Sequence, residues 1–257
     1  MSLALPAYYT ALAPFRERFE AGNPILTYHK VGPRPRGARI KGLYLSPDLF
    51  HRQMDELRAA GFTNGSLAAC AGPRTGRRLV ITFDDGYVNV LRHTLAPLAE
   101  ARLQGVQFLV ADRLGRCNEW DVPLGEAPEP MMDAAQVREW LAAGHDLGSH
   151  TRTHPHLTQL PPDKAREEIA ASKKKLEDLF GRPIDHFCYP FGDWNEAVRD
   201  LVREAGYRTA CTTESGVNDE RTSPFALKRF TARYASRNWR NLGLWLAWRF
   251  QRRDLRC

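Results

Sequence analysis

Two adjacent carboxylates, Asp84 and Asp85, follow a short apolar run over residues 79–83 (LVITF). Such a run is typical of a strand that is buried on both faces of a parallel sheet. The carboxyl ends of parallel strands are where α/β folds place their chemistry. Gly86 allows a sharp turn directly after the pair, so that both acids can point into one pocket. An Asp-Asp-Gly sequence is also a common plain turn, so the pair alone does not establish a site.

Two histidines, His150 and His154, follow a second predicted strand near residues 146–151. One histidine there is usually a satisfied polar residue, but two at this spacing can bind one metal ion from the same side. A carboxylate from the acidic pair would complete a three-ligand set with open positions for water and substrate, as in catalytic metal sites. Pro155 prevents a helix from starting directly there, so we expect His154 on a loop. We interpret the neighbouring His156 as a surface or supporting residue.

Strand-like and helix-like segments that could position these residues alternate about seven times along the chain. Strands are expected near residues 25–31, 79–83, 106–111, 146–151, 187–190, 208–212 and 226–235. Helices are expected near residues 8–19, 46–57, 91–98, 137–141, 161–179 and 197–203, and a long irregular loop over 113–133. This alternation indicates right-handed βαβ units. We therefore predict an α/β fold, a distorted (β/α) barrel of about seven parallel strands, closed or incomplete.

Composition and charge narrow the class of protein. The chain is 43% hydrophobic and 26% charged, which is ordinary for a globular protein, and it shows no repeat or linker. We predict one domain over residues 1–257, with a core at about 24–235. The net charge is +7, but the basic residues are spread along the chain, so we expect a solvated surface and no nucleic-acid partner.

Cysteine usage and the N-terminus indicate the compartment. Five cysteines without a Cys-x-x-Cys pair predict neither a disulfide framework nor a zinc knuckle. The first twenty residues lack a basic start followed by a long apolar run, and no stretch is long enough to span a membrane. We expect a cytoplasmic protein, or one peripheral to the inner face of the membrane.

Three motifs together resemble a known family. Residues 82–86 (TFDDG), 149–154 (SHTRTH) and 187–192 (FCYPFG) are similar, in order and interval, to the first three motifs of the polysaccharide deacetylases, the NodB-homology family. The resemblance spans about residues 24–235. It implies a distorted (β/α) barrel and metal-dependent removal of acetyl groups from N-acetylated sugars, or less often from O-acetylated ones.

The resemblance also implies a role for each residue of the first two motifs. Asp85, His150 and His154 would bind one divalent metal ion, and Asp84 would be the general base. Two neutral imidazoles and a carboxylate suit Zn²⁺ best, with Co²⁺, Ni²⁺ or Fe²⁺ as alternatives. The oxyanion would be stabilised by the metal and by the main-chain N–H of Phe191.

The general acid departs from the common family pattern. The usual Leu-x-His motif near the C-terminal end is absent, because residues 227–230 read LKRF. His29 instead follows the first predicted strand. In a closed barrel the first and last strands are neighbours, and some members, similar to the poly-N-acetylglucosamine deacetylases, are permuted in this way. We therefore expect His29 to act as general acid, a role that suits its pKa; the alternative is a buried structural histidine.

The third motif also departs from the common family pattern. Cys188 stands where many members carry an arginine that pairs with the catalytic aspartate. Arg229, in the last predicted strand, is the candidate replacement for holding Asp84. The alternatives are a surface arginine or one bonded to Asp146. Cys188 itself is interpreted as a small buried residue.

Aromatic side chains often stack on sugar faces, so we expect a substrate groove lined by Trp120, Asp121, Tyr189, Phe191 and Trp194. Aromatic residues are also common in protein cores, and either role is open for each of them.

The last segment, residues 236–257, is amphipathic, aromatic and basic, and we predict a C-terminal helix there. It either covers the barrel, forms a dimer contact, or makes peripheral contact with an acidic membrane. The oligomeric state does not follow from the sequence.

These expectations combine into one function: a metal-dependent hydrolase, acting on C–N bonds other than peptide bonds, that deacetylates an N-acetylated sugar, polysaccharide or glycolipid intermediate. The alternatives are a hydrolase of a different amide or ester on the same scaffold, and an inactive carbohydrate-binding accessory protein.

Overall fold

The computed structural model describes residues 6–36 and 38–233. Seven parallel strands form a curled, incomplete barrel in the order β10-β1-β5-β6-β7-β8-β9. Their bounds are β1 (Ile25–Tyr28), β5 (Arg78–Phe83), β6 (Gly105–Leu109), β7 (Asp146–Ser149), β8 (His186–Cys188), β9 (Thr209–Cys211) and β10 (Phe230–Thr231). The predicted fold class is confirmed.

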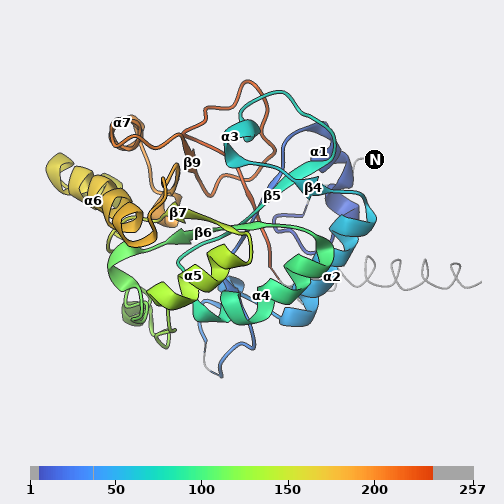
Figure 1. Cartoon of the computed structure of the whole chain (residues 1–257), viewed down its shortest axis with the longest axis horizontal. Helices are drawn as coiled ribbons and strands as arrows, with labels where there is room; N and C mark the ends of the chain where they lie inside the picture. Colours follow the sequence, from blue (N-terminus) through green and yellow to red (C-terminus); the bar gives the residue numbers. More distant parts are fainter. Residues whose placement is uncertain (1–5, 37, 234–257) are drawn as a thin grey trace, which may run out of the picture.

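Helices cover the outside of this sheet. Figure 1 shows α2, α4 and α5 on one side of it, and α6 and α7 near the end of the sheet that contains β7 and β9. The helices are α1 (Arg16–Ala21), α2 (Pro47–Ala59), α3 (Leu67–Cys70), α4 (Val88–Ala101), α5 (Ala134–Ala142), α6 (Pro162–Phe180) and α7 (Glu196–Glu204). In the part of the chain that the structure describes, no helix is both long and apolar enough to cross a membrane.

Local sequence signals set the helix ends. Ser46 accepts a hydrogen bond from the N–H of Leu49 at the start of α2, and Pro47 occupies its first turn. Asp133 and Gln136 form a reciprocal capping box at the start of α5. Gly181, with φ of +63°, ends α6 in the left-handed conformation that glycine adopts without strain.

The alternation of side chains along the strands divides the core in two. Leu26, Tyr28, Ile81 and Phe83 belong to the large cluster that packs against the helices. The residues between them face the barrel interior, where a smaller cluster consists of Ile25, Leu67, Cys70, Val80, Val106, Phe108, Cys188, Cys211 and Leu227. Successive strand residues point to opposite faces, so Thr27, Thr82 and Asp84 also face inward, at the carboxyl end of the sheet.

The first and last strands are neighbours, as the permuted arrangement requires. β1 pairs with both β5 and β10, and Leu227 bridges to Cys211 of β9. The predicted last strand over 226–235 was too long, because the chain leaves β9 at Leu227 and reaches β1 only at β10. Between them Lys228 and Arg229 bond to Asn218 and Glu214.

Other predicted boundaries also need correction. The strand expected over 25–31 is interrupted at His29: Lys30–Val31 (β2) pairs separately with Tyr44–Leu45 (β3). The expected helix over 8–19 is a 3-10 turn, η1 (Ala13–Phe15), followed by the short α1. We did not predict α3 or β4 (Thr63–Asn64), which pairs with β5.

Short 3-10 turns complete the connections: η2 (Lys41–Leu43), η3 (Ala111–Arg113), η4 (Val122–Leu124), η5 (Leu157–Gln159) and η6 (Pro190–Gly192). The predicted helix over 236–257 lies outside the described residues.

Candidate active site

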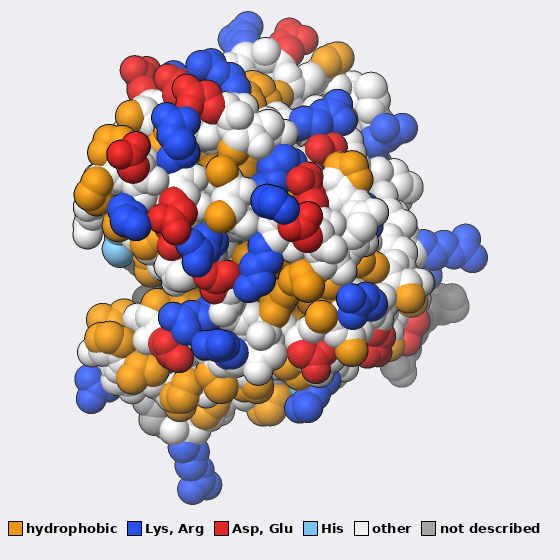
Figure 2. All heavy atoms as spheres, turned by 60° about the vertical axis from the view of Figure 1, so that its left-hand side comes forward, with side chains coloured by type: hydrophobic (Ala, Val, Ile, Leu, Met, Phe, Trp, Pro, Cys, Tyr) orange, Lys and Arg blue, Asp and Glu red, His pale blue; other side chains and the backbone are white. Residues whose placement is uncertain are grey.

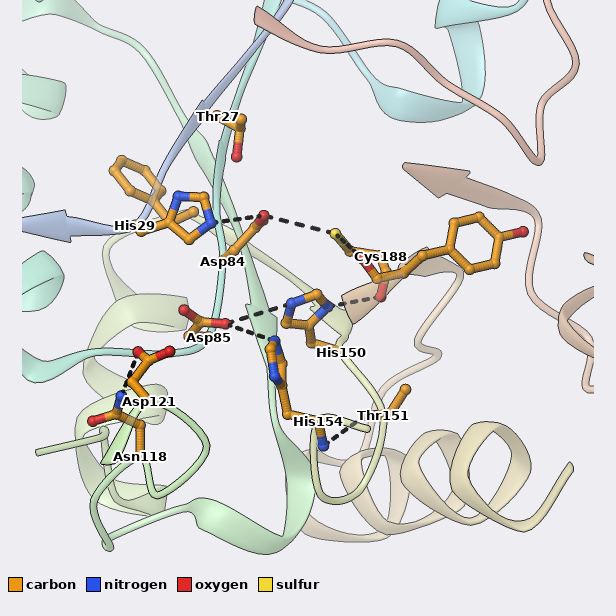
Figure 3. Close-up of polar contacts among 12 residues, drawn as sticks. Thr27, His29, Asp84, Asp85, Asn118, Asp121, His150, Thr151, His154 and Cys188 are labelled. Atoms are coloured by element: carbon orange, nitrogen blue, oxygen red, sulfur yellow. Dashed lines mark hydrogen bonds and ion pairs between the residues drawn. The ribbon is translucent and has the colours of Figure 1, made fainter. Parts of the chain in front are cut away.

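The sequence-predicted residues of the three motifs meet at the carboxyl edge of the sheet. Asp84 and Asp85 follow β5, His150 follows β7, and His29 follows β1 (Figure 3). Parallel neighbours end at the same edge, so strands distant in sequence deliver these side chains to one place. All are buried except His29, whose side chain is 21% exposed.

Strained backbone geometry accompanies the site. Among the described non-glycine residues, five have positive φ, and four of them are in or beside it: Asp85 (75°), Thr151 (67°), His154 (68°) and Phe191 (59°). This conformation is most unusual for β-branched Thr151, whose hydroxyl accepts a hydrogen bond from the N–H of His154. Such strain persists only where surrounding contacts enforce it, and it clusters at functional sites.

Asp85, His150 and His154 form a potential metal-binding set. The Nε2 atoms of both histidines lie 3.4 Å from Oδ1 of Asp85, and one ligand atom from each residue falls within 4.8 Å of the others. Figure 3 shows the three side chains pointing toward one another. One carboxylate and two imidazoles are donors that divalent transition metals accept.

The two histidines are held differently. Nδ1 of His150 lies 2.7 Å from the carbonyl oxygen of Cys188, a contact that requires Nδ1–H and leaves the Nε2 lone pair free for a cation. Nδ1 of His154 is buried without a hydrogen-bond partner. The His154 ring is instead packed between Trp120, stacked at 4.2 Å between centroids, and Phe191 at 4.5 Å. The residues therefore fit a metal ion.

Protonation of this metal-free set follows from its contacts. Burial raises the pKa of Asp85, but hydrogen bonds with His150 and His154 outweigh burial and hold it well below its usual range. Burial lowers the pKa of His154 to about 4, so this imidazole is neutral and able to bind metal at neutral pH.

Asp84 is held by Arg229. Nη1 and Nη2 of Arg229 donate to the two Asp84 carboxylate oxygens at 2.7 and 2.8 Å. Burial raises the pKa of Asp84, and the charge of Arg229 opposes this, so the pKa lies below its ordinary value. The structure thus places Arg229 where the resemblance expects the third-motif arginine, and not against Asp146, which pairs with Arg182.

Arg229 is itself fixed by contacts that the sequence did not reveal. It is buried and donates to the Thr212 carbonyl and to the hydroxyls of Thr27 and Thr82. It also lies 3.1 Å from the Cys188 sulfur. The two threonines alternate inward with apolar neighbours on adjacent strands, and this pattern was the available signal.

His29 lies beside Asp84. Its Nε2 is 3.7 Å from Oδ2 of Asp84. Burial lowers the pKa of His29 below its ordinary value, although Asp84 and Asp85 raise it in part. The partly exposed imidazole can reach a group that approaches from solvent, as a proton donor must.

Cys188 is buried among these groups, and its thiol lies 3.7 Å from Oδ2 of Asp84. Burial raises the pKa of this thiol to about 11, so it is protonated at neutral pH. The predicted role as a small buried residue agrees with this position.

The predicted substrate residues divide into two groups. Phe191 is 46% exposed, and Trp120 and Trp194 are half-buried, so each retains surface for a ligand. Tyr189 and Asp121 are buried. The hydroxyl of Tyr189 donates to the carbonyl of Phe225, so the structure places this ring in the core and corrects our expectation of a groove residue.

Asp121 also makes its contacts within the protein. Its carboxylate accepts a hydrogen bond from Asn118 at 2.9 Å and lies 3.7 Å from Nζ of Lys30. Neither partner was singled out by the sequence. The expected surface residue His156 is indeed exposed, with its ring stacked on Phe191.

A curled parallel barrel with three candidate metal ligands, an arginine-held carboxylate and a partly exposed histidine is an arrangement suited to metal-assisted hydrolysis. The family comparison agrees, because the polysaccharide deacetylase family matches residues 71–210. The chain belongs to this family.

Individual members of known sequence or structure are also similar to this chain. The Bacillus subtilis protein YxkH is 25% identical over 212 residues, 80% of this chain and 70% of the relative. The peptidoglycan-N-acetylglucosamine deacetylase of Bacillus cereus is 28% identical over 138 residues, 53% of this chain and 57% of the relative. Streptococcus pyogenes deacetylase PplD, solved with acetate, has a TM-score of 0.70 and 21% identity, and the match covers 82% of this chain and 92% of PplD. At this identity PplD shows the shared fold.

Proposed function

We propose that this protein is a metal-dependent hydrolase that removes acetyl groups from an N-acetylated sugar, polysaccharide or glycolipid intermediate. The observation that carries the proposal is the placement of His29 and the Asp84–Arg229 pair beside the metal-binding set Asp85, His150 and His154. An acid, a base and a set of metal ligands together can hydrolyse an unactivated amide.

The proposed metal has a defined part. Asp85, His150 and His154 would hold this ion, which would act as a Lewis acid that polarises the amide carbonyl and makes water more acidic. We propose Zn²⁺, which these ligands suit, with Co²⁺, Ni²⁺ and Fe²⁺ as alternatives.

The protein's own residues then move the protons. Asp84 accepts a proton from the attacking water, and Arg229 keeps this carboxylate ionised and oriented. His29 donates a proton to the departing sugar amine. The main-chain N–H of Phe191, whose positive φ places it in an unusual turn, is the proposed donor to the oxyanion.

One structural observation favours an enzyme over an inactive binding protein. The missing third-motif arginine made a loss of catalysis credible, but Arg229 supplies a bidentate partner to Asp84 from another part of the chain. The remaining alternative, a different amide or ester as substrate, shares the same site.

The substrate proposal draws on the relatives. The Bacillus cereus relative is named for action on peptidoglycan N-acetylglucosamine, which supports an N-acetylhexosamine here. Trp120, Phe191 and Trp194 are the proposed sugar-contacting residues, because each is at least partly exposed and aromatic rings can pack on the apolar faces of sugars.

The test is acetate release from N-acetylglucosamine oligomers, peptidoglycan fragments and glycolipids, before and after chelation. We expect release from at least one substrate, loss of release on chelation, and recovery on addition of Zn²⁺. An acetyl ester hydrolysed in place of every amide would establish the alternative substrate class. Binding of sugars without any acetate release, in protein loaded with each of the four metals, would establish the accessory protein.

Localisation is a separate proposal. We propose a cytoplasmic protein, either free or in peripheral contact with the inner membrane face through residues 236–257. Cell fractionation of the full chain and of a chain ending at residue 235 tests this contact. Equal distribution of the two between soluble and membrane fractions would contradict it.

A further inference from the structure

Lys30 places a buried charge directly beside His29. Its side chain has no exposed surface, and its Nζ has no hydrogen-bond partner among the described residues. The ammonium group lies between two aromatic rings, 4.9 Å from the centroid of Tyr44 and 4.8 Å from that of Tyr87. Its anionic neighbour is Asp121, at 3.7 Å. A buried ammonium costs stability that an apolar side chain of similar size would not, so electrostatic contact with Asp121 is its evident use.

Asp121 belongs to the long loop between β6 and α5. Its carboxylate accepts a hydrogen bond from Asn118, whose own side-chain oxygen accepts one from the N–H of Glu129. Glu129 in turn accepts from the hydroxyl of Tyr44 at 2.6 Å. Lys30 and Tyr44 are partners across the β2–β3 pair. Their contacts therefore join this loop to β2 and β3, and β2 begins at the residue after His29.

The residue next to Asp121 reaches the metal-binding set. Trp120 stacks on the ring of His154 with 4.2 Å between centroids and 23° between planes. His154 has no hydrogen bond at Nδ1 to orient its ring, in contrast to His150. The indole is thus a main constraint on the orientation of this imidazole, and its own position depends on how the backbone at Asp121 is held.

We propose that Lys30 is a positioning residue, whose ammonium group holds the Asp121 carboxylate and thereby seats Trp120 on His154. This inference rests on the proposed function, in which His154 binds the metal. It gives Asp121 a role inside the protein in place of substrate contact, and it gives a reason for the buried ammonium group of Lys30.

The first experiment follows Trp120 directly. The chain has six tryptophans, so the Trp120 signal is defined as wild-type fluorescence minus that of Trp120→Phe. We expect Zn²⁺ binding at His154 to change this signal in the wild type. Lys30→Met, which removes the charge and leaves an unbranched side chain only one atom shorter, should lose at least half of this change while still binding one Zn²⁺ per chain.

Kinetics supply the second readout. Lys30→Met should lower kcat/KM about tenfold to a hundredfold, the range expected when a reacting group is misplaced. If Lys30 acts through Trp120, Lys30→Met combined with Trp120→Phe should match Trp120→Phe alone within about twofold, because coupled residues are not additive. Fully additive losses, or an unchanged Trp120 signal in folded Lys30→Met, would overturn the proposal.

Lys173 offers a matched control. Its Nζ also lies over a tyrosine ring, 5.0 Å from the centroid of Tyr207, and pairs with Glu177 at 2.9 Å. It bonds the Ile184 carbonyl just before β8, at the edge of the sheet opposite the site. Lys173→Met should leave the Trp120 signal and kcat/KM unchanged. An equal effect of the two variants would assign the result to lost stability and overturn the positioning role.

Failure of the proposed function would be seen separately. If the wild type neither binds metal nor releases acetate, acrylamide quenching of Trp120 in the metal-free protein still tests the contact, with greater quenching expected in Lys30→Met. If Lys30→Met does not fold, Asp121→Asn removes the other half of the pair and keeps the shape needed to bond Asn118. Quenching equal to wild type in that variant would refute the inference.

Discussion

Asp84 and Asp85 are adjacent and almost equally buried, yet their partners give them different chemistry. Asp84 faces the barrel interior and is held by Arg229, whereas Asp85, with its positive φ, turns toward the two histidines. One carboxylate is therefore kept ionised by a fixed cation and the other is available to a metal. Two like groups acquire separate roles when their environments differ in this way.

Asp84→Asn tests the base. Loss of a general base typically lowers the rate by about 10²–10⁴-fold, so we expect kcat to fall in this range while metal content stays at the wild-type value. Steady-state acetate release and elemental analysis measure the two quantities. Asp146→Asn, at a partly exposed carboxylate that pairs with Arg182, is the control. A rate near that of wild type would show that Asp84 is not the general base.

The Asp84–Arg229 pair also predicts a pH-dependent stability. Because the folded pKa of Asp84 is depressed, its contribution is present above the unfolded pKa and is lost as pH falls through the folded pKa. Arg229→Met leaves a buried carboxylate unpaired and should cost about 3–5 kcal/mol at neutral pH. The difference from wild type should shrink as the solution is acidified, because protonation removes the uncompensated charge.

Urea unfolding of the metal-free protein from pH 7 to pH 3 measures this difference. Arg182→Met, which breaks a partly exposed pair, should cost less than about 1 kcal/mol throughout. A constant difference between wild type and Arg229→Met across the pH range would show that lost packing, not charge, explains the effect.

At the scale of elements, the turns that follow β5 and β7 position the metal-binding residues as much as the strands themselves do. The turns after them hold Asp85, Thr151 and His154 at positive φ, which the extended strands could not provide. Gly148 permits close packing of β7 against its neighbours: a Cβ there would lie 2.4 Å from the ring of Phe108 and 2.9 Å from the His186 carbonyl oxygen.

Gly148→Ala should therefore separate β7 from its neighbours and displace His150, two residues on. Overpacking of a well-filled core costs about 1–3 kcal/mol, and we expect weaker metal binding in addition. Urea unfolding and metal titration measure the two effects. Gly72→Ala, whose new methyl group would meet its nearest atom at 3.4 Å, should change neither by a comparable amount. If Gly148→Ala binds metal as tightly as wild type, the packing of β7 does not control the geometry of the metal ligands.

Across the whole molecule, the metal-binding set connects strands from different parts of the barrel. Asp85 follows β5 and the two histidines follow β7, with β6 between these strands. A ligand that binds only this arrangement stabilises the fold by mass action, by about 2.7 kcal/mol at a concentration one hundred times its Kd.

Addition of Zn²⁺ to metal-free protein should accordingly raise Tm, and His150→Ala should lose this shift. His186→Ala is the matched control, because His186 bonds Thr209 away from the metal-binding set. Thermal unfolding with and without Zn²⁺ measures the shift. An equal rise in Tm for His150→Ala and wild type would place the stabilising metal elsewhere on the protein.

Residue patterns alone were enough to predict the strand–helix alternation, the parallel barrel and the meeting of three motifs at one edge. They could do so because apolar runs mark buried strands, and parallel strands end at the same side of a sheet. Residue patterns offered three environments for Arg229, and the structure shows that it pairs with Asp84, 145 residues away. They gave no sign of the contact between Lys30 and Asp121 or of the place of Tyr189 in the core. These contacts depend on the curl of the sheet and the path of the loops, which fix side-chain directions that local residue patterns do not encode.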